Sequence, residues 1–523
     1  MTTSLIPTYK DLSFYSNPES NEIRYNQLAE EFNKNFNAKP DFFARSPGRV
    51  NLMGDHIDYN FFSVLPMAID VDVVAAVKRD DSRTVIITNT DSVNFAKETF
   101  ELPQDGSEIT IDQEAFSWGN YFKCGFIVAH KYILENRPDL VSDGSKPLKG
   151  LKITFNGTVP TGGGLSSSAA FCVASTLAVL RANGIDNVSK ADLTRITVVS
   201  EHYVGVNTGG MDQCASVYGE VSKALLIHFK PKLLGIPFGF PKISKDDELT
   251  FLISNSLQKA NKHETAPIHY NLRVVEMAIA SDILSKKLNI NPPRDSNLST
   301  SSLRGVMDAY FTEIKKQDKW DADDFQTGID RLRALLELIE DKAIFTDEQK
   351  IGFTVEDAAK TLGLDETEFQ TAYLTKFPVR FELLKLYQRT KHVFAESLRV
   401  LECLSLFHQF KQSSENPQQF LEAFGKIMNE SQVSLDTLNN SSNEKLNEIC
   451  SIALKNGSYG SRVTGAGWGG SIVHLTTTKN LQKLVNALTT EYYKVEFPEI
   501  SQEELNEAIV DSKPAAGSCV VLL

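Results

Sequence analysis

The chain has 523 residues, of which 41% are hydrophobic and 23% charged, and its formal net charge is −13 at pH 7. This length predicts two or more domains, and the acidic balance argues against a surface that binds nucleic acid or an anionic membrane. The six scattered cysteines lack metal spacing, no apolar run approaches the ~18 residues of a membrane span, and no secretory signal is visible, so we expect a soluble, cytoplasmic protein.

The first 235 residues alternate predicted strands and helices, after a lead-in of residues 1–38 that contains a short helix near Gln27–Phe36. Apolar and β-branched stretches predict strands at Phe42–Gly54 (two strands around a Pro-Gly turn), Val71–Val77, Thr84–Thr88, Leu151–Phe155 and Leu225–Phe229. Apolar periodicity predicts helices at Trp118–Leu134, Ala169–Arg181 and Lys190–Val204, the last with Ser189 as its N-cap.

A Pro/Gly-rich connection near residue 235 predicts a boundary between an N-terminal lobe of residues 39–235 and a C-terminal lobe of residues 236–523. In the second lobe, residues 288–303 are predicted to be a linker, and residues 330–410 are almost wholly helix-patterned. The other predicted elements are strands at Thr250–Ser254, Ser471–Thr476 and Ser518–Leu522, and helices at Pro267–Lys287, Phe420–Leu438, Glu444–Asn456 and Leu481–Val495.

A loop rich in glycine and serine stands out at Val159–Phe171, which reads Val-Pro-Thr-Gly-Gly-Gly-Leu-Ser-Ser-Ser-Ala-Ala-Phe. Glycines permit unusual backbone angles, and a loop of free N–H groups that runs into a helix N-terminus binds phosphate groups well. The serine hydroxyls add donors, and one of them can reach a metal ion on the phosphates. Taken alone, the loop is equally well explained as a turn before a buried helix.

Charged and polar residues concentrate at Gly48–Tyr59, where an arginine, two carboxylates and an imidazole fall close together. Such groups can make directed hydrogen bonds to the hydroxyls of a sugar, although a surface turn with mutually paired charges has the same composition. Two further carboxylates, Glu201 and Asp212, can divide metal binding and proton abstraction, or can be an ordinary solvated Glu and a turn-capping Asp.

Gly465–Gly470 matches the dinucleotide fingerprint GxGxxG letter by letter. That fingerprint follows a strand and opens a helix, whereas these glycines lead into the strand-like Ser471–Thr476. We therefore interpret them as a turn that allows close backbone approach. A Walker A loop, a G-x-S-x-G elbow and an HExxH helix are also absent from the sequence.

With these residues the chain resembles the galactokinases, within the family of small-molecule kinases that includes homoserine, mevalonate and phosphomevalonate kinases. Three motifs carry the resemblance in the right order: Gly48–Tyr59, Val159–Ala170 and Gly465–Gly470. The resemblance extends to Glu201–Tyr203, to Gly209–Gln213 and to a fungal-looking Asn261–Pro267 with Tyr270, and it covers roughly residues 40–523.

The resemblance implies an α+β, two-lobed small-molecule kinase fold with mixed sheets and the active site in the cleft between the lobes. It places a helix-rich insertion at about residues 290–400 of the C-terminal lobe, similar to that of fungal galactokinases. The implied reaction is phosphorylation of the anomeric hydroxyl of galactose by ATP, which yields galactose 1-phosphate and ADP and is the first phosphorylation step of galactose catabolism.

The resemblance also implies roles for individual residues. The expected sugar-binding residues are Arg49, Asp55, His56, Asp58, Thr208, Gly210, Asp212 and Tyr270. The expected ATP-binding residues are Gly162, Gly164, Ser166, Ser167, Ser168, Asn261 and Lys262. Ser167 and Glu201 would hold Mg2+, Asp212 would be the catalytic base, and Arg49 would favour the ionised Asp212 and steady charge in the transition state.

Two alternatives remain at this point. Asp55 stands where many galactokinases have Glu, which leaves open whether the sugar is galactose or N-acetylgalactosamine. Related proteins of budding yeasts are galactose- and ATP-dependent sensors that bind a transcriptional repressor, and such a role can coexist with kinase activity. The non-catalytic branch has a shortened serine/alanine run, so the full-length Ser166–Ala170 favours an active kinase.

Overall fold

The computed structural model describes residues 4–112, 117–144, 146, 148–204, 209–244, 247–258, 266–376, 378–413 and 416–523. Its largest sheet has seven strands in the order β1-β13-β2-β3-β6-β4-β5. These strands are β1 (Thr8–Tyr9), β2 (Phe42–Met53), β3 (Leu65–Asp80), β4 (Thr84–Asn89), β5 (Glu98–Glu101), β6 (Gly150–Gly157) and β13 (Cys519–Val521). The strand nearest the end of the chain therefore lies inside the sheet, between β1 and β2.

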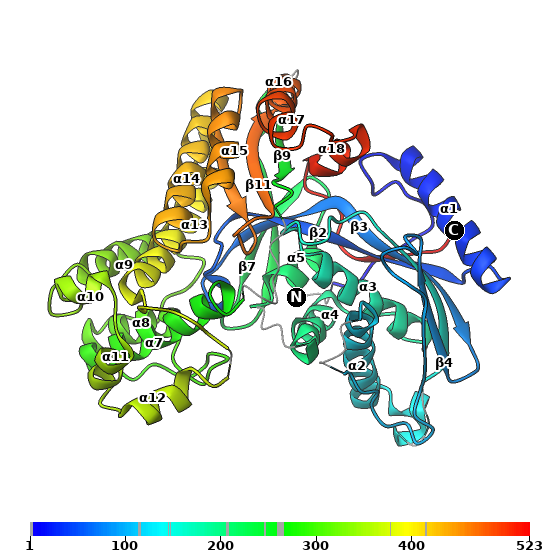
Figure 1. The fold of residues 1–523 in the computed structure, drawn as a ribbon, viewed down its shortest axis with the longest axis horizontal. Helices are drawn as coiled ribbons and strands as arrows, with labels where there is room; N and C mark the ends of the chain where they lie inside the picture. The colour runs from blue at the N-terminus through cyan, green and yellow to red at the C-terminus, as the bar shows by residue number, and fades with distance from the viewer. Residues whose placement is uncertain are drawn as a thin grey trace.

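Helices cover both faces of this sheet (Figure 1). One face carries α1 (Pro18–Phe36), and the other carries α2 (Gly119–Asn136), α3 (Ser167–Ala182), α4 (Lys190–Val198) and α5 (Met211–Tyr218). Side chains alternate along β3 accordingly: Val74 and Ala76 pack in the α1 cluster, whereas Val73, Ala75 and Val77 belong to the main core. This period of two is what a strand buried on both faces requires.

Strand β2 corrects one sequence-based expectation. Phe42–Met53 is one fully buried strand rather than two strands around a Pro-Gly turn, and its pairing with β3 shifts register between Pro47 and Arg49. A Cβ on Gly48 would lie 2.8 Å from the carbonyl oxygen of Leu165. The Pro-Gly pair therefore marks a bulge at which another loop approaches the strand, not a reversal of the chain.

Two other local predictions are also wrong in part. Ser189 caps α4 as expected, because its hydroxyl accepts from the Asp192 amide at 2.9 Å, but α4 ends at Val198 and a separate 3-10 helix, η3 (Ser200–Val204), follows it. The expected Pro/Gly-rich connection near residue 235 contains strand β8 (Leu234–Gly239), which pairs with β7 (Lys223–His228). The predicted lobe boundary at that point stays a prediction.

A second, four-stranded sheet has the order β10-β11-β9-β12. Its strands are β9 (Leu249–Asn255), β10 (Gly460–Thr464), β11 (Ser471–Thr477) and β12 (Ile509–Ser512). A separate core lies under the helices at the top of Figure 1, which are α15 (Glu444–Lys455), α16 (Thr478–Leu488), the π-helical turn η5 (Thr489–Tyr493), α17 (Lys494–Glu496) and α18 (Gln502–Ala508).

Most of the described residues between 270 and 437 lie in helices, which confirms the helix-patterned stretch at 330–410 and the helices expected at Pro267–Lys287 and Phe420–Leu438, whereas three further helical elements begin at residues 303, 310 and 325, outside those ranges. The elements of this region are α7 (Tyr270–Leu288), α8 (Leu303–Ala309), the π-helical turn η4 (Tyr310–Ile314), α9 (Phe325–Leu338), α10 (Asp347–Ile351), α11 (Val355–Leu362), α12 (Glu366–Tyr373), α13 (Leu386–Ser413) and α14 (Pro417–Thr437). Gly352 and Gly363 follow the ends of α10 and α11, where N-capping residues Thr354 and Asp365 start new helices two residues later.

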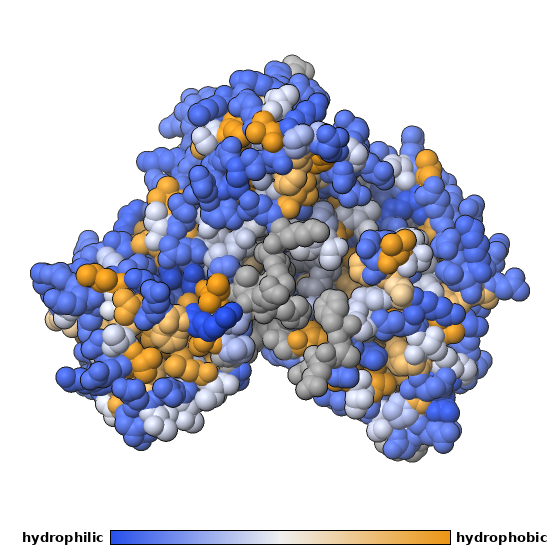
Figure 2. Space-filling model, viewed as in Figure 1, coloured by the Kyte–Doolittle hydropathy of each residue, from blue (hydrophilic) through white to orange (hydrophobic). Residues whose placement is uncertain are grey.

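The face shown in Figure 2 is largely hydrophilic, and its lower edge is indented between the helices around α7 and those around α2 and α4. Over the described ranges, every helix is too short or too polar to cross a membrane.

Candidate functional site

The loop between β6 and α3 has the backbone geometry expected of an anion cradle. Gly162 and Gly164 both have φ of +74°, and Ser166, the N-cap of α3, has φ of +62°. A Cβ on Gly162 would meet open space, whereas one on Gly164 would lie 3.1 Å from the carbonyl oxygen of Thr464. Gly162 is therefore required by the backbone angle alone, whereas Gly164 is required both by the angle and by close packing against Thr464.

The loop is anchored from two sides. The backbone N–H of Arg49 donates to the Leu165 carbonyl oxygen at 3.1 Å, and the Ser471 hydroxyl donates to the Gly163 carbonyl oxygen at 2.6 Å. Within the described chain, the buried hydroxyl of Ser166 has no hydrogen-bond partner. Ser167 and Ser168 form the partly exposed first turn of α3. Unused donors at a helix N-terminus are suited to the oxygens of a phosphate chain.

The Arg49 side chain joins this loop to a carboxylate. Its Nη1 donates to the Gly164 carbonyl oxygen at 2.7 Å, and its Nε donates to Asp212 Oδ1 at 2.9 Å. Asp212 lies in the first turn of α5, which begins after Gly210 with φ of +97°. The Asp212 side chain is 22% exposed and that of Arg49 only 5%, so the carboxylate is the solvent-facing member of the pair.

Asp58 is the second carboxylate of the site. It opens the short helix η1 (Asp58–Asn60), and a Cβ on Gly209 would lie 2.3 Å from its Oδ2, so the turn before Asp212 passes directly over Asp58. Burial, and then the nearby charge of Asp212, raise the pKa of Asp58 to about 7. Tyr270, at the start of α7, faces the same group: Asp58 and Asp212 both act to raise the pKa of its hydroxyl, after burial.

His56 is a structural link within the site. It has φ of +63°, and its ring nitrogens lie 3.0 Å from the Tyr59 hydroxyl and 2.8 Å from the Ala466 carbonyl oxygen. Burial lowers the pKa of His56 to about 3, so the ring is neutral at physiological pH. Its ring also contacts Tyr270 and Trp468, with centroids 5.7 and 5.5 Å apart. An aromatic wall therefore stands between the Gly48–Tyr59 motif and the glycine-rich turn at 465–470.

Asp55 is buried and its carboxylate is occupied by protein groups. Oδ1 accepts from the Gly465 backbone N–H at 3.0 Å, and Oδ2 lies 2.7 Å from Nη2 of Arg462, which is fully buried. Burial raises the pKa of Asp55 although Arg462 acts to lower it. Asp55 thus ties the Gly48–Tyr59 motif to the 465–470 turn.

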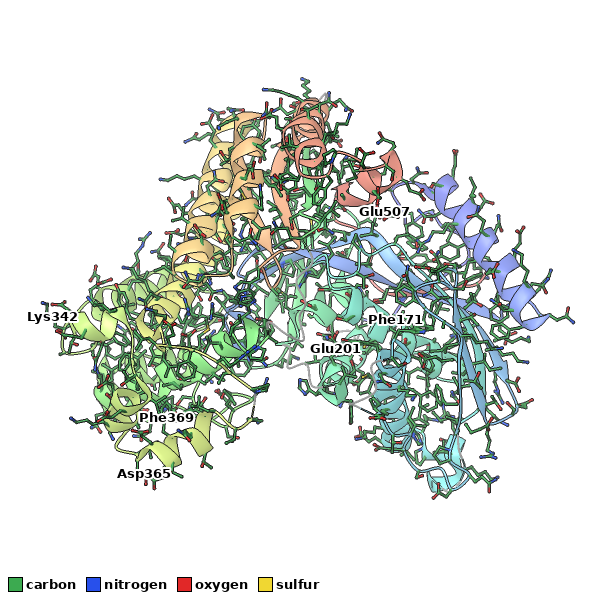
Figure 3. All side chains as sticks on the ribbon, viewed as in Figure 1. Phe171, Glu201, Lys342, Asp365, Phe369 and Glu507 are labelled. Atoms are coloured by element: carbon green, nitrogen blue, oxygen red, sulfur yellow. The ribbon has the colours of Figure 1, made fainter. Side chains whose placement is uncertain are left out.

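Glu201 lies beside α3 and α5. It is buried in η3, its Oε2 accepts from Gln213 Nε2 at 2.8 Å, and its charge contributes to the raised pKa of Cys172 on α3. Figure 3 labels Glu201 and Phe171, the neighbour of Cys172, in the central part of the molecule. Gln213 directly follows Asp212, so it connects the two carboxylates that the sequence singled out.

The donor set fits a magnesium ion that arrives with phosphates. No cluster of three or more His, Cys, Asp or Glu side chains suited to a metal occurs in the described parts of the chain. Mg2+ in kinases is held by one or two protein groups together with phosphate oxygens and water, so a single carboxylate and a serine hydroxyl suffice. Glu201 beside α3 and the hydroxyls at the start of α3 are groups of this kind.

Three of the predicted site residues, Thr208, Asn261 and Lys262, lie outside the described residues. The others converge from β2, η1, the β6–α3 loop, η3, α5 and α7. Two charged residues in contact with them, Arg462 and Glu396, are not predicted from the sequence. For Arg462, the sequence offers one hint of a special role: it is the one charged residue inside the strand Gly460–Thr464. For Glu396 the sequence offers none, because it is one charged residue among many in a long helix.

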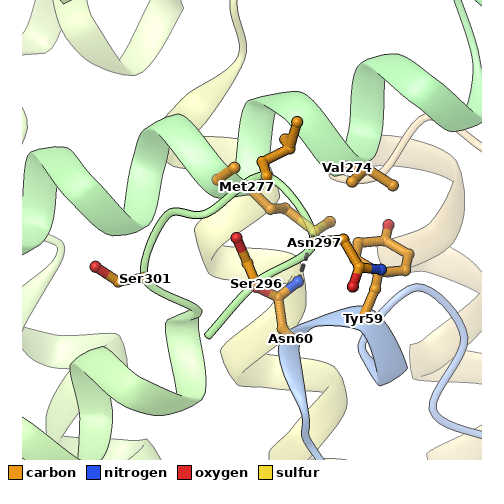
Figure 4. Close-up of a pocket in the computed structure, with 9 residues that line it drawn as sticks. Tyr59, Asn60, Val274, Met277, Ser296, Asn297 and Ser301 are labelled. Carbon is orange, nitrogen blue, oxygen red and sulfur yellow. Dashed lines mark hydrogen bonds between the residues drawn. The ribbon is translucent and has the colours of Figure 1, made fainter. Parts of the chain in front are cut away.

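A small cavity lies behind Tyr59 (Figure 4). Its volume is about 20 Å3, and its lining includes Asn60, whose Nδ2 donates to Met277 Sδ at 3.1 Å. This space holds about one water molecule. It is too small for a sugar, so it does not serve as a substrate site.

Comparison with known families matches three segments of the chain. Residues 30–79 match the galactokinase galactose-binding signature, residues 120–220 the N-terminal domain of GHMP kinases, and residues 410–494 the GHMP kinase C-terminal domain. The galactokinases of Schizosaccharomyces pombe and Candida albicans are each 59% identical over 99% of this chain, which covers 99% and 98% of those proteins. The Saccharomyces cerevisiae galactokinase is 47% identical over 94% of each chain.

Solved structures share the fold. Lactococcus lactis galactokinase complexed with galactose superposes with a TM-score of 0.63 at 20% identity, covering 95% of this chain and 99% of that one. Methanococcus jannaschii mevalonate kinase gives a TM-score of 0.51 at 17% identity, covering 91% and 98%. At these identities the structural likeness concerns the arrangement of the elements.

Proposed function

The chain belongs to the galactokinase family of GHMP kinases and is a sugar kinase, and from this premise we propose how its residues divide the work of transferring a phosphoryl group from ATP to the anomeric hydroxyl of galactose. The observation that carries the proposal is the Arg49 guanidinium, which contacts both the Gly164 carbonyl oxygen and the Asp212 carboxylate. It connects the phosphate loop to the group suited to accept a proton.

On the sugar side, the groups left to contact galactose are Asp58, Tyr270, Asp212 and the backbone of Gly209–Gly210. Asp58 lies directly against Gly209, and Asp58 and Asp212 are both near enough to Tyr270 to raise the pKa of its hydroxyl. Asp55 and His56 act differently in this proposal. Gly465 donates to Asp55 Oδ1, Arg462 forms an ion pair with Asp55 Oδ2, and Ala466 and Tyr59 contact the His56 ring nitrogens, so both residues shape the pocket. This arrangement makes the shorter Asp55 side chain compatible with galactose, since it need not reach the sugar.

On the nucleotide side, the backbone of Gly162–Gly164 and the hydroxyls of Ser166, Ser167 and Ser168 would bind the ATP phosphates at the N-terminus of α3. Ser167 and Glu201 would hold Mg2+ together with the phosphate oxygens. Bound there, Mg2+ would supply positive charge to the phosphates. Asn261 and Lys262 stay predicted nucleotide contacts.

In the reaction, Asp212 accepts the proton of the anomeric hydroxyl as that oxygen forms a bond to the γ-phosphorus of ATP. The bond from that phosphorus to the bridging oxygen breaks at the same time, and ADP leaves with the electron pair. Arg49 donates to the Asp212 carboxylate and to the Gly164 carbonyl oxygen, so it orients the base beside the loop that faces the phosphates and can steady charge there during the transfer. The products are galactose 1-phosphate, ADP and a proton that Asp212 returns to solvent.

A panel of sugars tests this assignment. Purified protein with ATP and Mg2+ is offered galactose, N-acetylgalactosamine, glucose and mannose, and ADP release is followed in a coupled assay. We expect kcat/KM for galactose to exceed that for each other sugar by at least about 100-fold. A sugar that lacks a hydroxyl in the expected position leaves polar groups of the site without a hydrogen-bond partner, and this strongly disfavours its binding.

The panel also separates the alternatives. Preferred turnover of N-acetylgalactosamine would reassign the substrate. Binding of galactose and ATP without ADP release would support a sensor that binds a transcriptional repressor, and would contradict the proposed enzyme.

A further inference from the structure

One helix of the extra helical region reaches into the sugar-binding motif. Glu396 of α13 is fully buried, and its Oε1 accepts from the Gly54 backbone N–H at 3.0 Å, across 342 positions of sequence. One helical turn earlier, His392 Nε2 lies 3.1 Å from the carbonyl oxygen of Asp55. The backbone on both sides of the Gly54–Asp55 peptide is therefore held by one face of one helix.

Glu396 also acts on Asp55 through a shared partner. Nη2 of Arg462 lies 2.7 Å from Asp55 Oδ2 and 3.3 Å from Glu396 Oε1, so the guanidinium sits between the two carboxylates. Its other nitrogens are also used: Nη1 donates to the Asn51 carbonyl oxygen and Nε to the Ser431 hydroxyl, both at 3.0 Å. Glu396 therefore helps to fix the position of the Arg462 guanidinium, and that position determines where the Asp55 carboxylate lies.

The backbone at this point depends on close packing against α13. Gly54 has φ of +105°, and a Cβ there would lie 2.9 Å from Val64 and 3.2 Å from Val400 of the same helix. Arg399 and the Ser431 hydroxyl contact Glu396 at 2.8–2.9 Å from its other sides. Although burial acts to raise the pKa of Glu396, Arg462 and Arg399 lower it to about 2, which keeps it charged.

We propose that Glu396 is the positioning residue of the sugar-binding motif: it holds the Gly54 N–H directly and orients Asp55 through Arg462. The inference rests on the proposed function, since it assigns a task to a residue that touches neither substrate. The proposal also assigns a role to α13, the last helix of the extra helical region: through Glu396 and His392, this helix holds the backbone of the sugar-binding motif in place.

The test is Glu396→Gln, which keeps size and one hydrogen-bonding oxygen but removes the charge. We expect KM for galactose to rise by about ten-fold, while KM for ATP stays within about two-fold and kcat within about three-fold, because the loss concerns sugar placement and not the transfer step. The matched control is Asp282→Asn, another buried carboxylate of the helical region, which accepts from Ser301 and Tyr373 and has no contact with Gly54, Asp55 or Arg462. The control should leave both KM values within about two-fold.

Equal rises in both KM values, or none, in folded Glu396→Gln would overturn the proposal and leave Glu396 a purely structural residue. If Glu396→Gln does not fold, Ser431→Ala removes a neutral donor to Glu396 and should raise KM for galactose alone by about three-fold. A folded Ser431→Ala with unchanged KM for galactose would also contradict it. Failure of the proposed function is distinct, because wild-type protein would then release no ADP with galactose.

Discussion

At the scale of single residues, the site contains two carboxylates that a sugar can reach, and their surroundings differ. Asp212 is paired with Arg49 at 2.7–2.9 Å and is partly exposed. Asp58 has a pKa raised to about 7 by burial and by the charge of Asp212. Asp212 is partly exposed and is held beside the phosphate loop by Arg49, which suits proton acceptance next to the phosphates, whereas the buried Asp58 suits hydrogen bonding to a sugar hydroxyl.

Substitution of each carboxylate separates the two roles. Asp212→Asn is expected to lower kcat by about 10²–10⁴-fold with KM for galactose changed by less than about three-fold, because the amide cannot accept the proton. Asp58→Asn is expected to raise KM for galactose by about ten-fold with a smaller loss of kcat. Steady-state kinetics with both substrates varied provides the measurement.

The reverse pattern, with kcat lost in Asp58→Asn and retained in Asp212→Asn, would move the base to Asp58. Binding of a non-hydrolysable ATP analogue serves as the control, since neither carboxylate is placed among the phosphate-binding groups.

The residues of the site differ in how far the sequence reveals them. Short runs of polar residues and glycine contain Arg49, Asp58 and Asp212, so the sequence alone indicates these three residues as candidates. It does not indicate Glu396 and Arg462, because their importance comes from contacts with Asp55 and Gly54 across hundreds of positions. Asp55 itself was expected to contact the sugar, and its burial against Arg462 depends on the same distant contacts.

At the scale of elements, the β6–α3 loop offers a matched pair of glycines. Gly162 and Gly164 share φ of +74°, but only Gly164 has a close neighbour for a Cβ and a carbonyl that binds Arg49. An alanine at either position costs about 1–2 kcal/mol for the backbone angle alone. Any larger effect at Gly164 must then come from its contacts.

Gly164→Ala is accordingly expected to lower kcat/KM for ATP at least about ten-fold more than Gly162→Ala does, because a shifted Gly164 carbonyl also releases Arg49 from its position beside Asp212. Kinetics at saturating galactose measure the difference. Equal losses in the two variants would show that the Arg49–Gly164 contact contributes nothing to catalysis.

The elements also show where local sequence signals stop being informative. Pro47-Gly48 predicts a turn, yet β2 continues because it pairs with β3 on both sides of the pair, from Phe42 to Pro47 and again from Arg49, with a shift of register between them. Conversely, helix α13 and its neighbours are predicted well, since amphipathic spacing and capping residues are local properties. No local sequence pattern predicts which face of α13 contacts the Gly54–Asp55 turn, because that contact is long-range.

At the scale of the whole molecule, the resemblance and the two-lobed α+β kinase fold expected from the sequence are confirmed by full-length relatives and by solved structures of the same fold. The N-terminal lead-in is part of this fold: Tyr15, Arg24 and Arg45 all donate to the buried Asp72 carboxylate, at 2.5–2.7 Å. Arg45 in turn donates to the carbonyl oxygens of Ala516 and Gly517. A single buried carboxylate thus organises contacts between distant parts of the chain.

Asp72→Asn is expected to reduce the free energy of unfolding by about 3–5 kcal/mol, because it leaves the fully buried Arg45 and the largely buried Arg24 without their anionic partner. Urea unfolding followed by circular dichroism measures the loss. The control is Asp80→Asn on the same strand, where the pair with Lys152 is partly exposed and is worth about 1 kcal/mol or less. A loss in Asp72→Asn no larger than in the control would contradict the buried network's importance.

The position of β13 has a consequence for how the protein is made. Its three residues fill the gap between β1 and β2, so the seven-stranded sheet stays incomplete until residue 521 has been added. Domains of many large proteins fold in turn as they emerge from the exit tunnel. Here the edge of β2 that β13 covers stays open through the translation of more than 400 residues, and an open strand edge can pair with other strands during that time.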